Sequence, residues 1–463
     1  MLDRFESGAM DMVLKNTDRR FDPTNTSSPY YPSLDPLNSI RVGFVISGQT
    51  YWVYTGYVER WPQIWKGATW AETDITCVDG FEFLSNHNIG SSYATYVLTL
   101  SGARTFTYTS ASIGYVGNST TVAQIQSGIN TALTVSVVGV DVTVNLATNG
   151  AGAITSTWAD VASAVSASGS ASALVVATLV GTDSTATAFA KTSLTGGTFV
   201  QQLSGARVSA ILDYVQWPTS ARSIASGTHE CQAQSIDPGT TTTATSYLQE
   251  VEITEIGALF LDRNGKVVFL DQGTLGSSSY ATVASVFADK SGTNVGTFPY
   301  QDLQGDFDRD LIFNNVISTR LNGEPQTASD STSDDKYFTR SLSLNPLSIN
   351  ENESLSLAQA YVAKYKAPFF RFEPMKLFPG TNLSMWLNLV QRELLDTVQV
   401  LRTPPGGGPV INKTGRIISI EITGSNSIAN TVFSIQIDPS SGVNSLILDD
   451  STYGTLDYNT LGY

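Results

Sequence analysis

The stretch that decides the fold runs from Arg41 to Tyr57 and reads RVGFVISGQTYWVYTGY. Apolar residues alternate with polar or small ones on both sides of Ser47-Gly48, a pair typical of a tight turn. Alternation with a period of two is the pattern of a β-strand, whose successive side chains point to opposite faces. The stretch therefore predicts a β-hairpin. Its alternating apolar residues are Val42, Phe44, Ile46, Tyr51, Val53 and Tyr57.

The β pattern extends over residues 1–92. Thr73, Ile75 and Cys77 alternate with polar neighbours after a cluster of tryptophans, which predicts another strand. Residues 21–36, rich in Pro, Asn and Ser, cannot form regular structure and are expected to be a loop. We expect residues 1–92 to form a first β-barrel.

Residues 93–200 differ abruptly in composition, because proline is absent and Ala, Ser, Thr, Gly and Val dominate. Thr121 to Asn130 and Thr157 to Ser166 each place Ala with Val or Ile at helical spacing, which predicts two short helices. The change suggests an inserted small α+β domain. Its expected strands are Thr105–Tyr108, Val135–Leu146 and Leu174–Val180.

The sequence pattern of residues 201–303 predicts a middle α+β region. Helices are expected from Gly205 to Val215, where Trp217-Pro218 ends the pattern, and from Thr242 to Thr254. A hairpin follows, with strands Ala258–Leu261 and Val267–Leu270 flanking Asn264-Gly265, a strong turn signal.

Residues 304–463 predict a second β-barrel. Strands dominate there, interrupted by one expected helix, Ser354–Lys366. Alternating strands Ile417–Ile422 and Thr431–Ile437 close the pattern before a short tail, Tyr453 to Tyr463. The predicted fold class is thus mainly β with α+β parts: two barrel-like domains, a middle α+β region and an inserted small α+β domain.

Composition and charge exclude several classes of protein. Charged residues are 14% of the chain, below the roughly 25% of an ordinary soluble domain, which suits a protein packed against neighbours. The formal charge of −15, with no basic stripe, argues against specific nucleic-acid binding. Two cysteines make no disulfide framework. We find no signal peptide and no membrane span, and therefore expect a protein that is made and kept in the cytoplasm until assembly.

The residues that could carry chemistry do not form a known catalytic motif. Neither His87 nor His229 lies in a triad motif, and the chain contains neither a G-x-S-x-G elbow nor a P-loop. His229-Glu230-Cys231 lacks the second pair of ligands that a zinc site needs. We therefore predict no catalytic, cofactor-binding or metal-binding residues and no cofactor.

Three other patterns have a plainer interpretation. Asp306, Asp308 and Asp310 imitate the start of a calcium loop, but Leu311 stands where glycine is needed and Ile317 where a glutamate is needed. Gly406-Gly407-Gly408 lacks a following Lys-Ser/Thr and reads as a flexible loop. An aromatic concentration could stack on sugars but fits packing better. It comprises Tyr30, Tyr31, Trp61, Trp65 and Trp70.

A series of short motifs, in order, resembles one protein family. The first motifs are Phe5-Glu6-Ser7-Gly8, Leu14 to Pro23 with Pro29-Tyr30, Pro36 to Val42, Tyr54 to Val58 and Thr76 to Phe81. The later ones are Ser204 to Arg207 with Trp217-Pro218, Leu248 to Phe260 with Asn264-Gly265, Asp310 to Val316 with Thr319-Arg320, and Leu394 to Val400 with Pro404-Pro405-Gly406 and Gly415 to Ile420. Together they resemble minor tail proteins of long-tailed phages of Gram-positive, especially actinobacterial, hosts.

The chain departs from that family in two ways. Members usually carry a further strand before the Phe-Glu-Ser-Gly motif, so either a neighbouring subunit supplies it or the first barrel is cut down. The insertion at 93–200 is the second departure. Its segments Leu146 to Thr157, Ala159 to Val165 and Leu194 to Thr198 are similar to a decoration domain of phage fibre and tail proteins.

The resemblance implies a structural hub at the virion's tail tip and not an enzyme. Such a hub is expected to be a homotrimer. Its expected partners are the distal tail protein, the tape-measure protein and tail-tip fibre or receptor-binding proteins. The alternatives are a hexameric distal tail protein, or a receptor- or cell-wall-binding module acting through residues 93–200. Cell-wall hydrolysis ranks last.

Overall fold

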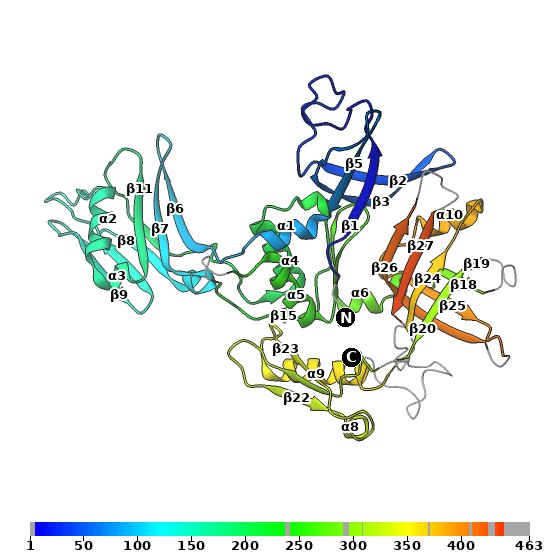
Figure 1. Cartoon of the computed structure of the whole chain (residues 1–463). Helices are drawn as coiled ribbons and strands as arrows, with labels where there is room; N and C mark the ends of the chain where they lie inside the picture. The colour runs from blue at the N-terminus through cyan, green and yellow to red at the C-terminus, as the bar shows by residue number, and fades with distance from the viewer. Residues whose placement is uncertain are drawn as a thin grey trace.

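The computed structural model describes residues 5–236, 241–289, 296–307, 309–368, 371–406, 410–424 and 431–438. The chain is mostly β and is divided among several sheets, with helices in the centre and in the surrounding units (Figure 1). The predicted fold class, mainly β with α+β parts, is confirmed. Within the described residues, no helix is both long and apolar enough to cross a membrane.

The first sheet is an open half-barrel whose strands follow the order β1-β5-β3-β2, with β4 pairing β5. The predicted hairpin is present, and its turn at Ser47-Gly48 has φ of 51° and 81°. Residues 21–36 form irregular turns as expected. The elements are β1 (Ala9–Lys15), β2 (Ser39–Ile46), β3 (Gln49–Arg60), β4 (Ile64–Lys66), β5 (Trp70–Val78) and α1 (Gly80–Asn86).

The region from 93 to 200 contains two small sheets packed around one core that includes Phe106, Tyr108 and Trp158. Its two ends are neighbours, because Thr95 and Thr195 exchange backbone hydrogen bonds of 2.7 and 3.0 Å. The elements are β6 (Tyr93–Leu100), β7 (Arg104–Ile113), η1 (Gly114–Ser119), β8 (Thr121–Ile125), β9 (Thr134–Val138), β10 (Asp141–Asn145), α2 (Trp158–Ala167), α3 (Gly169–Ser172), β11 (Val175–Val180) and β12 (Phe189–Ser193).

One predicted helix in this region is wrong. Thr121 to Asn130 begins with strand β8, which pairs parallel to β10 and antiparallel to β12. Pairing on both sides places β8 inside a sheet, and this tertiary context overrides the weak helical spacing of Ala and Val. The expected strand Val135–Leu146 is a hairpin of β9 and β10, turned at Gly139. The second predicted helix corresponds to α2, which begins after Thr157 with a capping box.

The middle region holds the largest core, formed by α4, α5, α1 and the β16–β17 hairpin. Helices α4 and α5 lie within one or two residues of their predicted positions, and the hairpin turns at Gly265 with φ of 78°. The elements are β13 (Gln202–Leu203), α4 (Ser204–Tyr214), η2 (Thr219–Ala221), β14 (Arg222–Ile224), β15 (Glu230–Cys231), α5 (Ala244–Glu255), β16 (Ala258–Leu261), β17 (Val267–Leu270), α6 (Gln272–Gly276) and α7 (Ser278–Ala281).

The largest sheet has the order β19-β18-β25-β26-β27-β24-β20 and draws strands from both sides of residue 304. The predicted closing strands correspond to β26 and β27, within one residue at the start of β27. The tail Tyr453 to Tyr463 lies outside the described residues. The elements are β18 (Ser285–Ala288), β19 (Thr297–Pro299), β20 (Asp302–Asp306), β24 (Arg371–Leu377), α10 (Leu383–Leu389), β25 (Thr397–Arg402), β26 (Ile411–Thr423) and β27 (Val432–Asp438).

Between β20 and β24 the chain forms a separate small unit, at the bottom of Figure 1, in which α9 packs on a three-stranded sheet. The expectation of one helix after residue 304 is wrong, because α8 and α10 also form. Both have seven residues and are capped by Asp330 and Asn382, so they are too short to show a helical period. The elements are β21 (Asn315–Ser318), β22 (Gln326–Ser329), α8 (Ser331–Tyr337), β23 (Ser341–Leu344) and α9 (Glu351–Tyr365).

The first sheet also packs on the largest sheet. The far end of the β2–β3 hairpin contributes Phe44 and Ile46 to the core of the largest sheet. The Phe44 ring lies 5.0 Å from that of Trp386 and 6.3 Å from that of Phe433, between ring centres. The hairpin that opens the sequence pattern therefore connects two units as well as building one.

Candidate functional site

The two histidines lie in different surroundings. His87 is exposed at the end of α1, with Nδ1 2.9 Å from the carbonyl oxygen of Phe83. His229 is partly buried, and its Nδ1 lies 3.6 Å from Oε2 of Glu255, whose side chain is fully buried. The carboxylate raises the pKa of His229 above its ordinary value, against the effect of burial.

Glu255, which ends α5, is the centre of a buried polar cluster that the sequence did not reveal. Burial alone would raise its pKa, but hydrogen bonds from His229, Thr228 and Ser204 outweigh it and lower the pKa to about 2. The hydroxyls of Ser204 and Thr228 donate at 2.7 and 2.6 Å, and the backbone N–H of His229 donates at 2.9 Å. The cluster fastens the loop after β14 to two helices.

A serine, a histidine and a glutamate therefore meet, but in an order that does not make a nucleophile. Acyl transfer needs a histidine that takes the proton of the serine while the acid orients the histidine. Here Ser204 donates directly to Glu255, and His229 faces the same carboxylate. Ser204 is also fully buried, out of reach of a substrate. The hydrogen bonds of this cluster hold the loop at residues 228–229 against α4 and α5.

The segment His229-Glu230-Cys231 does not bring three metal ligands together. The Glu230 carboxylate accepts from Gln201 at 2.6 Å. Cys231 is buried in the core beside α4 and α5, and burial raises the pKa of its thiol to about 12. Across the part of the chain that the structure describes, no group of three His, Cys, Asp or Glu residues could hold a metal ion.

Two further patterns fall partly outside the described residues. In the calcium-like series Asp308 is not among them, while Asp306 and Asp310 are exposed and Asp306 accepts from the N–H of Phe307 at 2.7 Å. In the glycine run, Gly406 lies in a turn, and Gly407 and Gly408 lie outside the described residues.

The aromatic concentration divides into two groups. Tyr30 and Trp61 both stack on Phe21, with interplanar angles of 8° and ring centres 5.5 and 6.5 Å apart, so these rings hold the loop together. Trp65 and Trp70 are 68% and 45% exposed, on the β4–β5 hairpin. Trp70 pairs with Lys66, so it shares a face with Lys66 and not with Trp65. The two tryptophans therefore do not form one flat platform. Tyr31, which follows Tyr30, is half-exposed.

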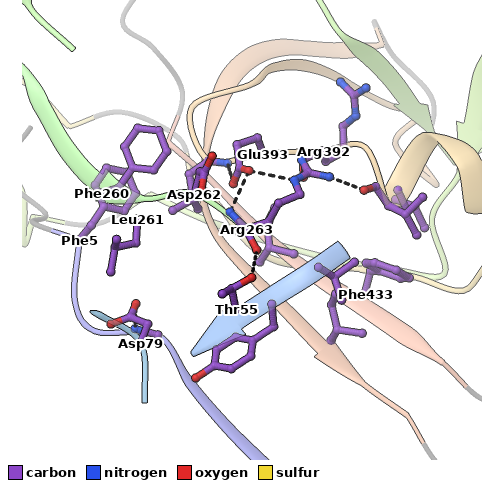
Figure 2. A pocket seen from close by; sticks show the side chains of 18 of the residues that line it. Phe5, Thr55, Asp79, Phe260, Leu261, Asp262, Arg263, Arg392, Glu393 and Phe433 are labelled. Carbon is purple, nitrogen blue, oxygen red and sulfur yellow. Dashed lines mark hydrogen bonds and ion pairs between the residues drawn. The ribbon is translucent and has the colours of Figure 1, made fainter. Parts of the chain in front are cut away.

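The residues that join the units gather around Arg263, in the loop between β16 and β17. Figure 2 shows Arg263 between Thr55 of the first sheet and Glu393, which lies just before β25. Its Nε donates to Glu393 at 2.9 Å, and its terminal nitrogens donate to the carbonyls of Val390, Gln391 and Arg392. The Thr55 hydroxyl donates to the Arg263 carbonyl at 2.8 Å. One loop thus connects three units.

A small cavity of about 170 Å³ lies beside this loop, lined by residues of the same three units (Figure 2). Asp79 closes one side. It accepts from the Ser7 hydroxyl at 2.8 Å and from the N–H groups of Gly8 and Phe81 at 2.6 and 2.9 Å. Burial raises the pKa of Asp79. The ring of Phe5, two residues before Ser7, has its centre 5.5 Å from that of the Phe260 ring.

The junction holds the three units together through one partly buried arginine, Arg263. Arg263 is 18% exposed and Glu393 28% exposed, and the planar guanidinium satisfies several acceptors with a fixed geometry. Sequence reasoning found the turn at Asn264-Gly265 but not the role of Arg263, because its partners lie about 130 residues away in the chain.

Comparison with known proteins gives matches of structure alone. Neither a protein-family model nor a curated protein matches the sequence. The 43 kDa tail protein of prophage MuSo2 from Shewanella oneidensis is 12% identical, with a TM-score of 0.44 over 94% of this chain and 90% of that one. A tail protein from Neisseria meningitidis is 11% identical, with a TM-score of 0.48 over 93% and 87%. Prophage tail protein gp18 from Listeria monocytogenes is 8% identical, with a TM-score of 0.34 over 88% and 86%.

Proposed function

We propose that the chain is a structural protein of a phage tail, a hub at the tail tip of the virion. The ordered motifs quoted above support the family. The observation that carries the structural role is the junction at Arg263, which fixes the first sheet, the middle region and the largest sheet to one another through side-chain and backbone hydrogen bonds. The matched solved structures are tail proteins as well, but with TM-scores below 0.5 they carry none of the support.

The hub is a homotrimer in this proposal. The first sheet leaves β1 and β2 as edge strands, and β2 is eight residues long with one charged residue, Arg41. A long edge with few charges invites pairing with another chain, and strand addition is an economical way to join subunits. A neighbouring subunit that adds a strand at an edge of this sheet would complete the half-barrel.

The partners follow from this position. The distal tail protein and the tape-measure protein would lie on the tube side of the hub, and fibre or receptor-binding proteins on the other side. The charge of −15 suits a ring through which DNA passes, because like charge removes the attraction that counterion release would provide.

Native mass spectrometry of the purified chain tests the trimer, and a reconstruction of the tail tip tests its place. We expect assemblies of three chains, at the end of the tube. Sixfold assemblies would contradict the trimer and favour a distal tail protein. A position elsewhere in the tail would contradict the hub. Purified chain that hydrolyses peptidoglycan would contradict a purely structural role.

A second function, receptor binding by residues 93–200, is favoured by the position of this region. Figure 1 shows it projecting from the body of the molecule, connected at one end. Since Thr95 and Thr195 are hydrogen-bonded neighbours, a short Gly-Ser linker can replace the residues between them. Loss of adsorption by phages with intact tails would support receptor binding. Unchanged adsorption would leave the region as decoration.

A further inference from the structure

Arg207, on α4, is the one Lys or Arg among the described residues that is fully buried. Its hydrogen-bond partners there are uncharged: the hydroxyl of Tyr247 at 2.5 Å and the carbonyl oxygens of Val200 and Gln232 at 2.6 and 3.0 Å. Its Nε has no hydrogen-bond partner in the same part of the chain. Replacing a buried charge by an apolar side chain is often neutral or stabilising, so stability alone does not explain this arginine.

The partners of Arg207 lie where the region of residues 93–200 joins the body, beside α4 and α5 in Figure 1. Val200 is the last residue of that region, and its carbonyl accepts from Arg207. Gln232 begins the segment 232–236, which follows β15 and is called the collar below. The buried arginine therefore connects the exit of the region to the collar.

The collar is hydrogen-bonded to both the entry and the exit of the region. At the entry, the N–H of Ser91 donates to the Ile236 carbonyl at 2.8 Å, and the Ile236 N–H donates to the Ser91 hydroxyl oxygen at the same distance. At the exit, the N–H of Gln234 donates to the Phe199 carbonyl at 3.0 Å. The Phe199 ring is buried, with its centre 5.4 Å from the guanidinium carbon of Arg207. The two chain crossings are thus held by the same short segment.

The collar also packs closely against a strand inside the region. The Ser235 hydroxyl donates to the carbonyl of Ile113, the last residue of β7, at 3.1 Å. The next residue is Gly114, with φ of 75°, where an added Cβ would lie 2.6 Å from the Ser235 hydroxyl oxygen. An added Cβ at Gly197 would lie 2.2 Å from the Gly114 carbonyl oxygen. Backbones that approach this closely leave little room for rotation at the junction.

Arg207 links the collar to both central helices. Its Nη2 donates to the carbonyls of Val200 and Gln232 together, so one planar group sets the distance between the exit and the collar. Its Nη1 donates to the Tyr247 hydroxyl on α5, and that hydroxyl donates to the side-chain oxygen of Gln234 at 2.9 Å. The resulting network spans α4, α5, the collar and the exit of the region.

We propose that Arg207 is a positioning residue, which holds the region of residues 93–200 in one orientation relative to α4 and α5. Domains joined only by chain crossings are expected to move relative to each other. The collar and the arginine remove that freedom, so a partner that binds the region displaces α4 and α5 with it. This inference goes beyond the proposed function, because it depends neither on what the region binds nor on the number of copies in the assembly.

Pulsed electron paramagnetic resonance between two spin labels on the full chain tests this orientation. Ser136→Cys places one label on the exposed side of β9, in the region, and Ser220→Cys places the other on the exposed turn η2, in the body. The natural Cys77 and Cys231 are fully buried, so the label goes to the introduced thiols. An excess of unlabelled chain keeps distances between copies out of the signal. With Arg207 present, the chain is expected to give one narrow distribution of distances.

Two variants loosen the junction from different sides. Arg207→Met keeps an unbranched side chain but loses every donor, so it is expected to broaden the distribution of distances. The amides of Gln234 and Ile236 are expected to exchange their hydrogens about tenfold faster, since a lost hydrogen bond shifts a local opening equilibrium by roughly that factor. Ser91→Ala removes the acceptor of the Ile236 N–H at the entry and is expected to act in the same direction.

The matched control is Arg104→Met. The Arg104 side chain donates to Ser101 and to the Thr182 carbonyl, which all lie within the region of residues 93–200. Its loss is expected to leave the distribution of distances unchanged. The control separates the junction from a general effect of removing an arginine, and circular dichroism shows which variants keep the wild-type fold.

A broad distribution for the chain with Arg207 overturns the proposal, because the region then swings despite the collar. A narrow distribution for folded Arg207→Met also overturns it, whatever Ser91→Ala does. If Arg207→Met does not fold, a narrow distribution for Ser91→Ala overturns the proposal and a broad one supports it. None of these results depends on the place of the chain in a tail, so the proposed function stands or falls by its own tests.

Discussion

Replacing Glu255 by glutamine tests whether the buried cluster around this residue stabilises the middle region. The carboxylate accepts from five donors, on Ser204, Thr228, His229 and Gln272. Glutamine keeps the shape but replaces one acceptor oxygen by an NH₂ group that faces these donors. The lost charge also removes the attraction for His229.

The magnitude follows from the lowered pKa. The pKa of Glu255 falls from the ordinary 4.5 to about 2. At about 1.4 kcal/mol for each pKa unit, this fall means that the charged carboxylate stabilises the folded state by about 3 kcal/mol. Solvent screening does not reduce this contribution, because the Glu255 side chain is fully buried. We expect Glu255→Gln to reduce the free energy of unfolding at neutral pH by about 3 kcal/mol.

The sign of the pH dependence is also determined. Because the folded-state pKa of Glu255 is lowered, its contribution is complete above about pH 4.5 and is lost as the pH falls from there toward about 2. His229 behaves oppositely. Its raised pKa gives stability that is present below pH 6.5 and is lost as the pH rises through the higher folded-state value.

Urea unfolding across this pH range is the assay, with hydrogen exchange at the Thr228 and His229 amides to locate the effect. The matched control is Glu324→Gln, at an exposed carboxylate, which is expected to change little. The reasoning is refuted if Glu255→Gln unfolds with the wild-type free energy at neutral pH. It is also refuted if the variant keeps the wild-type loss of stability between pH 4.5 and 2.

Three further predictions concern the junction, helix α4 and the thiols. Arg263→Ala removes the contacts to Glu393 and to the carbonyls at 390–392, so we expect the free energy of unfolding to fall by about 2–3 kcal/mol. Calorimetry should then show the largest sheet unfolding separately, whereas the control Arg60→Ala, at an exposed position, should change little. A single unshifted transition for Arg263→Ala would contradict this. Gly205→Ala improves helix propensity but places a Cβ 1.9 Å from the Ala225 carbonyl oxygen, so thermal unfolding should show a free energy of unfolding lower by about 3 kcal/mol. The control Gly169→Ala adds a Cβ in open space and should leave stability unchanged or raise it. Cys77 and Cys231 are fully buried, and burial raises the pKa of their thiols to about 11 and 12, so a disulfide reagent should react with them only on unfolding; rapid reaction of the folded chain would disprove their burial.

The sequence predicted those elements whose pattern is local. The hairpins at Ser47-Gly48 and Asn264-Gly265 each combine a turn signal with apolar alternation or a short apolar run, and both are present. Helix α5 was found because its apolar residues keep helical spacing over more than two turns. Thr121 to Asn130 failed because its short pattern fits a helix and a strand equally, and pairing with β10 and β12 decided between them.

The functional features could not be predicted because they depend on contacts distant in sequence. Glu255 reads as an ordinary last-turn residue, and only the fold brings Ser204 and Thr228 to it. Arg263 reads as a turn residue until Glu393 is placed beside it.

The closeness of Thr95 and Thr195 affects how such a protein can change over evolution. A segment that leaves and re-enters the body at one point can be lengthened, lost or exchanged by recombination at two sites without altering the register of any other sheet. Selection on residues 93–200 can therefore act separately from selection on the rest of the chain. The same architecture offers the engineer a single position at which a foreign domain can be grafted.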